Sequence, residues 1–471
     1  MEKRVLYVAS EGTPYAKSGG LGDVIGSLPH ALHNGWIADV IMPKYAHIDK
    51  ENLEFVESFE VNLGWRQLYA GIYRSEYKGV IYWFIDNEYY FRREQLYGYF
   101  DEAERYLFFS AAVVEWIQKN PKKYQMIHCH DWQSAWAAQL IKEKRMHLPV
   151  IFTIHNLRYQ GRYGKDVAVD LMGYDGIINE MEFDGDLNLM KGALVASDYV
   201  TTVSPSYAEE VMGHAYGEGL DPVLRGIKSK FRGVLNGLDL EKFNPMTDPF
   251  IRFPYRYSCK KKAQNKAALQ EELGLPQNSL PLIGFVSRLV EQKGLDLIVS
   301  VIHELINLDL QFVVLGTGEQ RYEELLIKTS REYPKRFRAI IDFDEGLAQR
   351  IYAASDMLLM PSRFEPCGLT QMIAQRYGSI PIVRATGGLK DTVCDYERSD
   401  ENPNGFVFER YDGFAMIEAV KRSIRAYQDP KIWQSLVRQS VNSVRSWEDS
   451  AKEYEDIYDQ VRERYSSEGE V

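Results

Sequence analysis

Residues 5–24 read VLYVASEGTPYAKSGGLGDV, and this stretch decides the fold that we expect. The short apolar run at 5–10 predicts a β-strand, and a glycine-rich loop then leads into a helical pattern that ends near Gly35. A second apolar run, ADVIMP at 38–43, follows at once. This order of strand, loop, helix and strand is typical of a parallel sheet that helices cover on both faces.

The same alternation continues along most of the chain. It predicts further strands at 125–129 and 149–155 in the first half, and at 280–287, 310–316, 338–344, 357–362 and 380–385 in the second. The fold class is therefore α/β, with two doubly wound, Rossmann-like domains. Residues 51–99 depart from the pattern, because they are aromatic and partly alternating, and we interpret them as an insertion or β-hairpin region.

The stretch 244–258, NPMTDPFIRFPYRYS, holds three prolines and shows no helical or strand period, which is typical of a linker. We expect a first domain over 1–245, a linker over 246–258 and a second domain over 259–451. Ligands of doubly wound folds bind at the carboxyl ends of the strands, so we expect the ligand in a cleft between the two domains.

Composition excludes several classes of protein. Apolar residues make up 45% and charged residues 26%, an ordinary globular mix that excludes disordered and disulfide-stapled chains. The net charge of −11, without a basic run, gives no footprint for nucleic acid or an anionic membrane. The four cysteines form no CxxC pair, the first apolar run is too short for a signal peptide, and no window could span a membrane. We expect a cytoplasmic protein.

The first loop carries Lys17 and the paired glycines Gly19 and Gly20. It follows a strand and opens a helix, where backbone N–H groups and the helix dipole favour an anion. Its spacing fits neither GxGxxG nor GxxxxGK[ST], so a dinucleotide site and a P-loop are both poorly supported. A tight turn without a ligand is the alternative interpretation.

Two loops of the second half carry matching chemistry. Arg288 and Lys293 lie five residues apart across a strand–loop–helix junction, and two such cations suit a diphosphate, although a pair of solvated surface charges is the alternative. Glu365 follows the strand at 357–362, where a carboxylate can accept hydrogen bonds from sugar hydroxyls, unless it is only a solvated loop acid. The backbone amides after it could bind phosphate; they belong to Cys367, Gly368, Leu369 and Thr370.

The strand at 149–155 ends on His155 and Asn156, in position to meet a ligand, although a lone histidine there is more often structural. His128, His130 and Asp131 could suggest a metal site. We expect none, because Asp131 is a good N-cap for the helical stretch after it and the spacing fits no known zinc enzyme. The aromatic residues at 97–100 could stack on sugar rings, although core packing is the more common role.

These loops resemble the family of bacterial glycogen synthases and plant starch synthases, retaining glycosyltransferases of the GT-B fold. The matching motifs occur in order over almost the whole chain: KSGGL (17–21), HDW (130–132), TIHN (153–156), VSPSYAEE (203–210), NGLD (236–239), SRLVEQKG (287–294), FEPCGLTQ (364–371) and TGGLKDTV (386–393). The resemblance implies transfer of glucose from ADP-glucose to the non-reducing end of an α-1,4-glucan, with retention of configuration and release of ADP. It also implies no cofactor, and a C-terminal helix at about 452–471 that packs back on the first domain.

The resemblance also implies roles for single residues. Arg288 and Lys293 would neutralise the diphosphate, Glu365 would hold the glucose hydroxyls, and His155 would lie beside the anomeric carbon. Further substrate contacts are expected from Lys17, Gly19, Gly20, Asp23, Tyr97, Asp131, Asn156, Asn236 and the backbone of Cys367, Gly368, Leu369 and Thr370.

One position departs from related GT-B enzymes, many of which carry a second acid eight residues after the first. Here that position is Ile373, a departure that glycogen synthases share and that argues against sucrose- or trehalose-synthase relatives. The alternatives that stay open are UDP-glucose as the donor, another GT-B nucleotide-sugar enzyme, a pyridoxal-phosphate-dependent phosphorylase and a non-catalytic glucan-binding protein.

Overall fold

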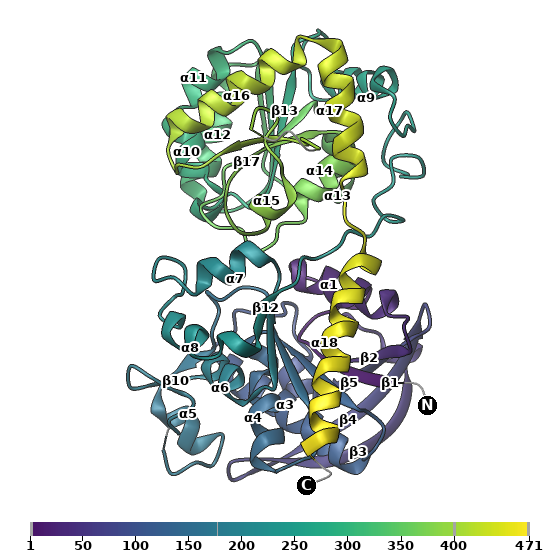
Figure 1. Ribbon diagram of the computed structural model, residues 1–471, viewed down its shortest axis with the longest axis vertical. Coiled ribbons are helices and arrows are strands. Elements are labelled where there is room, and N and C mark those ends of the chain that lie inside the picture. The colour runs from purple at the N-terminus through teal and green to yellow at the C-terminus, as the bar shows by residue number, and fades with distance from the viewer. Residues whose placement is uncertain (1–2, 177, 399–401, 469–471) are drawn as a thin grey trace. The chain divides into compact units, whose positions relative to one another are not determined.

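The computed structural model describes residues 3–176, 178–398 and 402–468. The chain divides into two compact units (Figure 1). The first runs to Asn236 and resumes at Trp447, and the second runs from Gly237 to Ser446. The described helices contain none that is long and apolar enough to cross a membrane.

The sequence placed the domain boundary at 245 and a linker over 246–258, but the contacts assign this stretch to the second unit. The buried hydroxyl of Tyr255 donates to the carbonyl oxygens of Tyr377, at 2.7 Å, and Ala353, at 3.3 Å. Asp248 accepts a hydrogen bond from the Tyr377 hydroxyl at 2.5 Å. Single buried anchors of this kind leave no period in the sequence, which is why the stretch resembles a linker.

The first unit is built on one large sheet with the strand order β12-β11-β7-β6-β1-β2-β5-β4-β3 among the described residues. Its strands are β1 (Lys3–Val8), β2 (Trp36–Pro43), β3 (Glu54–Leu63), β4 (Arg66–Tyr77), β5 (Val80–Asp86), β6 (Met126–His130), β7 (Val150–Ile154), β11 (Tyr199–Thr202) and β12 (Phe231–Gly233). The strands from β12 to β5 in this order are parallel, whereas β4 pairs antiparallel with both β5 and β3. The hairpin expected within 51–99 is therefore confirmed, and it extends the main sheet.

Helices pack around this sheet, and a small second sheet accompanies it. The helices are α1 (Gly20–Ala31), α2 (Glu88–Phe91), α3 (Glu102–Lys119), α4 (Ala135–Glu143), α5 (Lys165–Asp170), α6 (Leu189–Ala196), α7 (Pro205–Val211), α8 (Asp221–Gly226) and α18 (Trp447–Glu468). The small sheet has the order β8-β10-β9, with β8 (Arg162–Tyr163), β9 (Glu182–Phe183) and β10 (Asp186–Asn188).

The described residues of the second unit form a six-stranded parallel sheet with the order β15-β14-β13-β16-β17-β18. Its strands are β13 (Leu282–Val286), β14 (Gln311–Leu315), β15 (Phe337–Ile340), β16 (Met357–Met360), β17 (Ile380–Arg384) and β18 (Phe406–Phe408). Its helices are α9 (Cys259–Glu272), α10 (Leu295–Ser300), α11 (Ile302–Asn307), α12 (Gln320–Glu332), α13 (Glu345–Ala354), α14 (Thr370–Arg376), α15 (Gly387–Thr392), α16 (Gly413–Tyr427) and α17 (Pro430–Asn442).

Both faces of this sheet are buried, which explains the continuous apolar strands in the sequence. Along β14, Phe312 and Val314 pack into one core with α10, α11, α12, α16 and α17. Val313 and Leu315 point the other way, into a second core with α9 and α13. Because successive residues of a strand face opposite sides, each of them must be apolar when helices cover both. The doubly wound fold expected for each half is confirmed.

Helix α18, drawn in yellow in Figure 1, runs along the sheet of the first unit. The Tyr458 hydroxyl lies 2.6 Å from the Tyr7 hydroxyl on β1 and 2.8 Å from Nδ1 of His128 on β6. Glu455 is only 2% exposed, and its carboxylate accepts the backbone N–H groups of His33, at 2.6 Å, and Asn34, at 3.0 Å. These buried polar contacts fix the register of the helix on the sheet.

Each sheet reverses its winding direction at one place. In the first unit β1 lies between β2 and β6, and in the second β13 lies between β14 and β16. Loops leaving the two strands at such a point run to opposite sides and leave room for a ligand at the carboxyl ends. The loops after β1 and β6, and those after β13 and β16, are therefore where each unit can bind one.

Candidate active site

In the second unit, the loops after β13 and β16 bring Lys293 and Glu365 together. Lys293 ends a short 3₁₀ turn at Glu291–Lys293, and its Nζ donates to Oε2 of Glu365 at 2.6 Å. The hydroxyl of Ser362 donates to the same carboxylate oxygen at 3.1 Å. Glu365 is 6% exposed, so its charge is held by these two donors rather than by bulk solvent.

Arg288 follows β13 at the same edge of the sheet, two residues beyond Val286. Its side chain is exposed, and it forms no hydrogen bond or ion pair with a residue in 3–176, 178–398 or 402–468. In the described part of the chain, this edge thus offers the Arg288 guanidinium without a carboxylate partner, five residues before a lysine that already has one. Such a guanidinium can bind an anionic oxygen.

Two glycines allow the loops of this edge to approach one another closely. Gly294 has φ +79°, and a Cβ there would lie 2.2 Å from the Pro361 carbonyl oxygen. Gly387 has φ +44°, and a Cβ there would lie 2.1 Å from the Glu365 carbonyl oxygen. Because any side chain would push these backbones apart, the glycines fix the position of the loop that carries Glu365.

Arg384, at the end of β17, was not identified from the sequence. It is 8% exposed, and its Nη1 donates to the carbonyl oxygens of Ser362, at 3.2 Å, and Arg363, at 2.7 Å. These carbonyls belong to the loop before Glu365. An arginine that ends the apolar run IPIVR was the available signal, although the strand order needed to interpret it is not visible in the sequence.

The stretch after Glu365 is a loop that leads into α14. Gln371 donates through Nε2 to the carbonyl oxygens of Cys367, at 3.0 Å, and Gly368, at 2.7 Å, which ties the loop to the first turn of the helix. Leu369 is the N-cap, and its side chain is too apolar to cap the helix. The helix begins at Thr370, so of the four residues expected to bind phosphate through their amides, Leu369 and Thr370 form the helix start and Cys367 and Gly368 precede it in the loop.

An exposed aromatic residue, Phe343, lies beyond the end of β15 and was also not identified from the sequence. It is 83% exposed. Strand β15 is two strands from β13, which is about 10 Å at the usual spacing of neighbouring strands. Phe343 therefore offers an uncovered ring face at that distance along the edge that carries Arg288.

In the first unit, the loop after β1 holds its own ion pair. Lys17 Nζ donates to Oδ1 of Asp23 at 2.8 Å, so the cation expected to be available is already partnered. Gly19 is the N-cap of α1 and Gly20 its first residue, and Gly19 has no side chain with which to cap the helix. The two glycines and both charged groups thus lie together at one helix N-terminus.

Glu11 holds this loop in place through a hydrogen bond, although it was not predicted as a site residue. It is 3% exposed, and its carboxylate accepts the backbone N–H of Ser18. Burial raises the pKa of Glu11, while the Ser18 and Gly19 hydrogen bonds oppose that shift. The Glu11 carboxylate therefore connects the segment after β1 to the part of the loop that carries the glycine pair.

His155, Asp131 and Asn156 gather after β6 and β7. Asp131 was expected to cap the helical stretch after it, but its side chain makes no capping bond. Its Oδ1 instead accepts the backbone N–H of His155 at 2.7 Å, because the backbone at φ +56° turns the carboxylate towards β7. Burial raises the pKa of Asp131 to about 7 and lowers that of His155 to about 3. Asn156 uses Oδ1 to accept the N–H of Arg158 at 3.1 Å.

Tyr97 and Asn236 are the two remaining residues of the first unit that were predicted to contact the substrate. The Tyr97 hydroxyl lies 2.7 Å from the Ser10 hydroxyl, just after β1. Asn236 is 4% exposed, and its buried Oδ1 has no hydrogen-bond partner among the residues that the structure describes. A buried amide oxygen without a partner is costly in an isolated protein and is common where a ligand supplies the missing donor.

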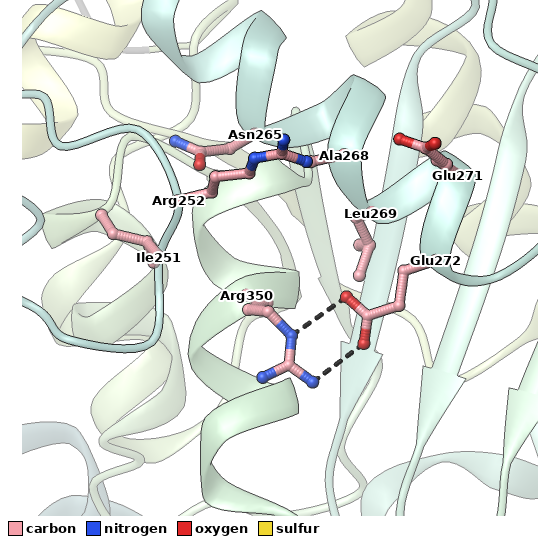
Figure 2. Close-up of a pocket in the computed structure, with 8 residues that line it drawn as sticks. All are labelled: Ile251, Arg252, Asn265, Ala268, Leu269, Glu271, Glu272 and Arg350. Atoms are coloured by element: carbon pink, nitrogen blue, oxygen red, sulfur yellow. Dashed lines mark hydrogen bonds and ion pairs between the residues drawn. The ribbon is translucent and has the colours of Figure 1, made fainter.

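A pocket of about 310 Å³ in the second unit is separate from these groups (Figure 2). Figure 2 shows the ion pair of Glu272 with Arg350 along its wall, with distances of 2.9 and 3.1 Å. None of the residues predicted to form the site lines this pocket; those that do are Ile251, Arg252, Asn265, Ala268, Leu269, Glu271, Glu272 and Arg350.

Comparisons with known proteins agree on a family. Residues 4–226 match the model of the starch synthase catalytic domain, and residues 266–439 match that of glycosyl transferases group 1. Glycogen synthase of Geobacillus thermodenitrificans is 44% identical over 97% of this chain and 98% of its own length. Glycogen synthase of Alkaliphilus metalliredigens is 45% identical over 97% and 99%.

Solved structures agree as well. The catalytic domain of starch synthase IV from Arabidopsis thaliana, bound to ADP and acarbose, matches with a TM-score of 0.90 and 35% identity over 98% of this chain and 100% of that one. Sucrose-phosphate synthase from Thermosynechococcus elongatus matches with a TM-score of 0.61 and 19% identity over 98% and 99%, which supports the fold alone.

Proposed function

This chain belongs to the glycogen and starch synthase family of glycosyltransferases, and we propose that it transfers glucose from ADP-glucose to the non-reducing end of an α-1,4-glucan. The reaction retains the anomeric configuration and releases ADP. The Lys293–Glu365 pair carries the proposal, because it and Arg288, which has no side-chain partner among the described residues, place cations and a sugar-binding acid on loops at one edge of the sheet. ADP in the Arabidopsis structure supports the choice of nucleotide.

Arg288 and Lys293 bind the diphosphate in this proposal. Breaking the bond between the sugar and the diphosphate places negative charge on the leaving oxygen, so cations fixed nearby lower the barrier. Within 3–176, 178–398 and 402–468 the Arg288 side chain has no partner to displace, and it can bind phosphate oxygens through its planar fork. The amides of Cys367, Gly368, Leu369 and Thr370 add donors at the start of α14.

Glu365 accepts hydrogen bonds from glucose hydroxyls. Its Oε2 is engaged by Lys293 and Ser362, whereas Oε1 has lone pairs left for a ligand. Since donor groups already orient the carboxylate, it loses little freedom when the sugar binds. The same loop thus holds the phosphate and the sugar of one donor molecule.

Phe343 stacks on the nucleotide base. Strand β15 lies two strand spacings, about 10 Å, from β13, so a nucleotide whose diphosphate is bound after β13 can extend its base towards Phe343. Stacking on an exposed ring accepts any base, so this contact gives affinity but does not choose between ADP and UDP.

The first unit contributes His155 beside the anomeric carbon and, from its glycine loop, Lys17, Gly19, Gly20 and Asp23 as donor contacts. Tyr97, Asp131, Asn156 and Asn236 are further substrate contacts, and the unpartnered amide oxygen of Asn236 is suited to a ligand hydroxyl. Asp131 already accepts a backbone N–H from His155, so it orients that residue as well.

The chemical step needs no covalent intermediate and no cofactor in this proposal. The bond from C1 to the diphosphate oxygen breaks, and the electron pair leaves on that oxygen. The 4-hydroxyl oxygen of the acceptor forms the new bond to C1 on the same face, and its proton passes to the leaving diphosphate. We place the reaction in the cytoplasm, where widely spaced free cysteines persist.

Proton NMR of a reaction with ADP-glucose and a maltooligosaccharide tests the proposal. We expect consumption of ADP-glucose, appearance of ADP and growth of the α-1,4 anomeric signal without a β signal. A parallel reaction with UDP-glucose tests the second candidate donor, because stacking on Phe343 does not distinguish adenine from uracil. Consumption of UDP-glucose alone would replace the donor, and a β product would overturn retention.

A further inference from the structure

The partly buried imidazole of His155 has one of its two nitrogens in contact with a fully buried histidine, His130. His130 is the last residue of β6 and pairs with Thr153 on β7, so His155 lies two residues beyond that partner. Nδ1 of His130 lies 3.0 Å from Nε2 of His155. Nδ1 of His155 has no hydrogen-bond partner among the described residues, so it is the nitrogen available to a ligand.

Both rings are neutral near pH 7. Burial lowers the pKa of His155 to about 3 and holds the pKa of His130 well below its usual range. Each ring therefore carries one N–H and one lone pair. In the contact between them one nitrogen must donate and the other accept, which leaves two possible arrangements of the protons.

The far nitrogen of His130 selects between the two arrangements. Its Nε2 is buried and has no hydrogen-bond partner in the part of the chain that the structure describes. Buried N–H groups without an acceptor are rarer in proteins than buried acceptors without a donor. The proton of His130 is therefore on Nδ1, where it has an acceptor, and His130 donates to Nε2 of His155.

We propose that His130 is a positioning residue, which fixes His155 as the tautomer with its proton on Nδ1. His155 then presents a neutral N–H donor to an oxygen of the bound substrate, either a sugar hydroxyl or a phosphate oxygen. Asp131 holds the backbone of His155 through its N–H, and His130 holds the ring. The role in transfer rests on the proposed function, whereas the tautomer does not.

The tautomer is measured directly on the full-length protein labelled with ¹⁵N-histidine. Long-range ¹H–¹⁵N NMR distinguishes a protonated nitrogen from an unprotonated one in each ring, and the His155 signals are assigned as those missing in His155→Gln. We expect a protonated Nδ1 and an unprotonated Nε2. A protonated Nε2 overturns the proposal. Since no substrate is present, a failure of glucosyl transfer contradicts only the proposed function.

Kinetics test whether the contact positions His155 for transfer. In His130→Asn the amide nitrogen occupies the place of Nδ1 and can still donate, whereas His130→Leu removes the donor. We expect kcat to fall at least 50-fold in His130→Leu and to return to within about fivefold of wild type in His130→Asn, with the Kd for ADP unchanged in both. Equal kcat in the two variants overturns the proposal. If His130→Leu does not fold, the wild-type spectrum decides alone.

His128 is the matched control. It lies in the same buried cluster, with its ring centroid 4.1 Å from that of His130, but it bonds to Tyr458 and Thr153 rather than to His155. We expect His128→Asn to lower the Tm as much as the His130 variants do and to keep the kcat of the wild type. A matching loss of kcat in His128→Asn would mean that the cluster acts only through stability, which overturns the proposal.

Discussion

Lys293 Nζ lies 2.6 Å from Glu365 Oε2, although the two residues are 72 positions apart in the sequence. The side chains are 17% and 8% exposed. The loops after β13 and β16 therefore place a cation and an acid in contact before any donor is bound. A prearranged pair of this kind needs little reorganisation when charge develops on the leaving group.

Removing either cation is expected to stop transfer. Arg288→Ala and Lys293→Ala should each lower kcat by about 100- to 1000-fold, because the lost interaction is strongest as the diphosphate departs. Arg288 is exposed and unpartnered among the described residues, so its variant should keep the wild-type Tm. Steady-state kinetics check this, with Lys328→Ala, 77% exposed on α12, as the control. Wild-type turnover in either variant removes that residue from the phosphate site.

Phe343→Ala is expected to weaken binding more than chemistry. Loss of one stacked base costs about 1–3 kcal/mol, so KM for ADP-glucose should rise roughly 5- to 100-fold while kcat changes little. Phe414→Ala is the control, since Phe414 is also an exposed ring, 64% accessible, but on α16 after β18 at the opposite end of the sheet. The assignment fails if both variants raise KM equally.

Arg384→Lys is expected to lower kcat at least tenfold. Both bonds to the loop before Glu365 come from Nη1, which the rigid guanidinium plane holds in place, whereas a lysine keeps the charge but ends in a freely rotating ammonium group. Arg338 also donates to two carbonyl oxygens, through Nε to Leu273 and through Nη2 to Gly274, away from that loop. Arg338→Lys should therefore match the loss of Tm without the loss of kcat. Normal kcat in Arg384→Lys would show that the glycines alone fix the loop.

The stability of the first unit should fall as the pH drops below about 6.5. Burial lowers the pKa of His128, His130 and His155, so these rings stay neutral in the folded state while the unfolded chain takes up protons. Asp131 acts in the opposite direction. Because its pKa is raised to about 7 in the folded state, the stability that its bound proton contributes is present below about pH 4 and is lost as the pH rises to about 7. Three histidines outweigh one acid near pH 5.

Urea unfolding at several pH values measures this balance. His130→Asn removes one of the three protons, so the slope of unfolding free energy against pH near pH 5 should decrease by about 1.4 kcal/mol per pH unit. An unchanged slope in His130→Asn would mean that His130 is protonated in the folded state.

Local patterns were sufficient to predict the doubly wound fold, and they place the candidate site loops directly after strands. Strands such as 310–316 are apolar throughout because both of their faces are buried, and this leaves a signal in one short window. The glycine-rich loop and the FEPCGLT stretch follow such strands directly. Their place at the ligand-binding edge then follows from the topology of any doubly wound sheet.

Contacts that depend on strand order could not be predicted. Arg384 contacts the loop before Glu365 only because β17 lies beside β16, and the role proposed for Phe343 depends on β15 lying two strands from β13. The Lys17–Asp23 pair shows a different limit, since a basic residue in a glycine loop suggests a free cation whether or not an acid six positions later neutralises it. Asp131 was assigned as a cap because its left-handed backbone has no signature in the sequence.

Transfer of radiolabelled glucose from ADP-glucose into precipitable glycogen, by the wild type and Lys293→Ala in parallel, tests the central claim most directly. We expect incorporation by the wild type and at least a 100-fold lower rate in the variant, with the fold intact by circular dichroism. Equal incorporation by the two proteins would contradict the assignment of the Lys293–Glu365 edge as the active site. No incorporation by the wild type would contradict the proposed reaction itself.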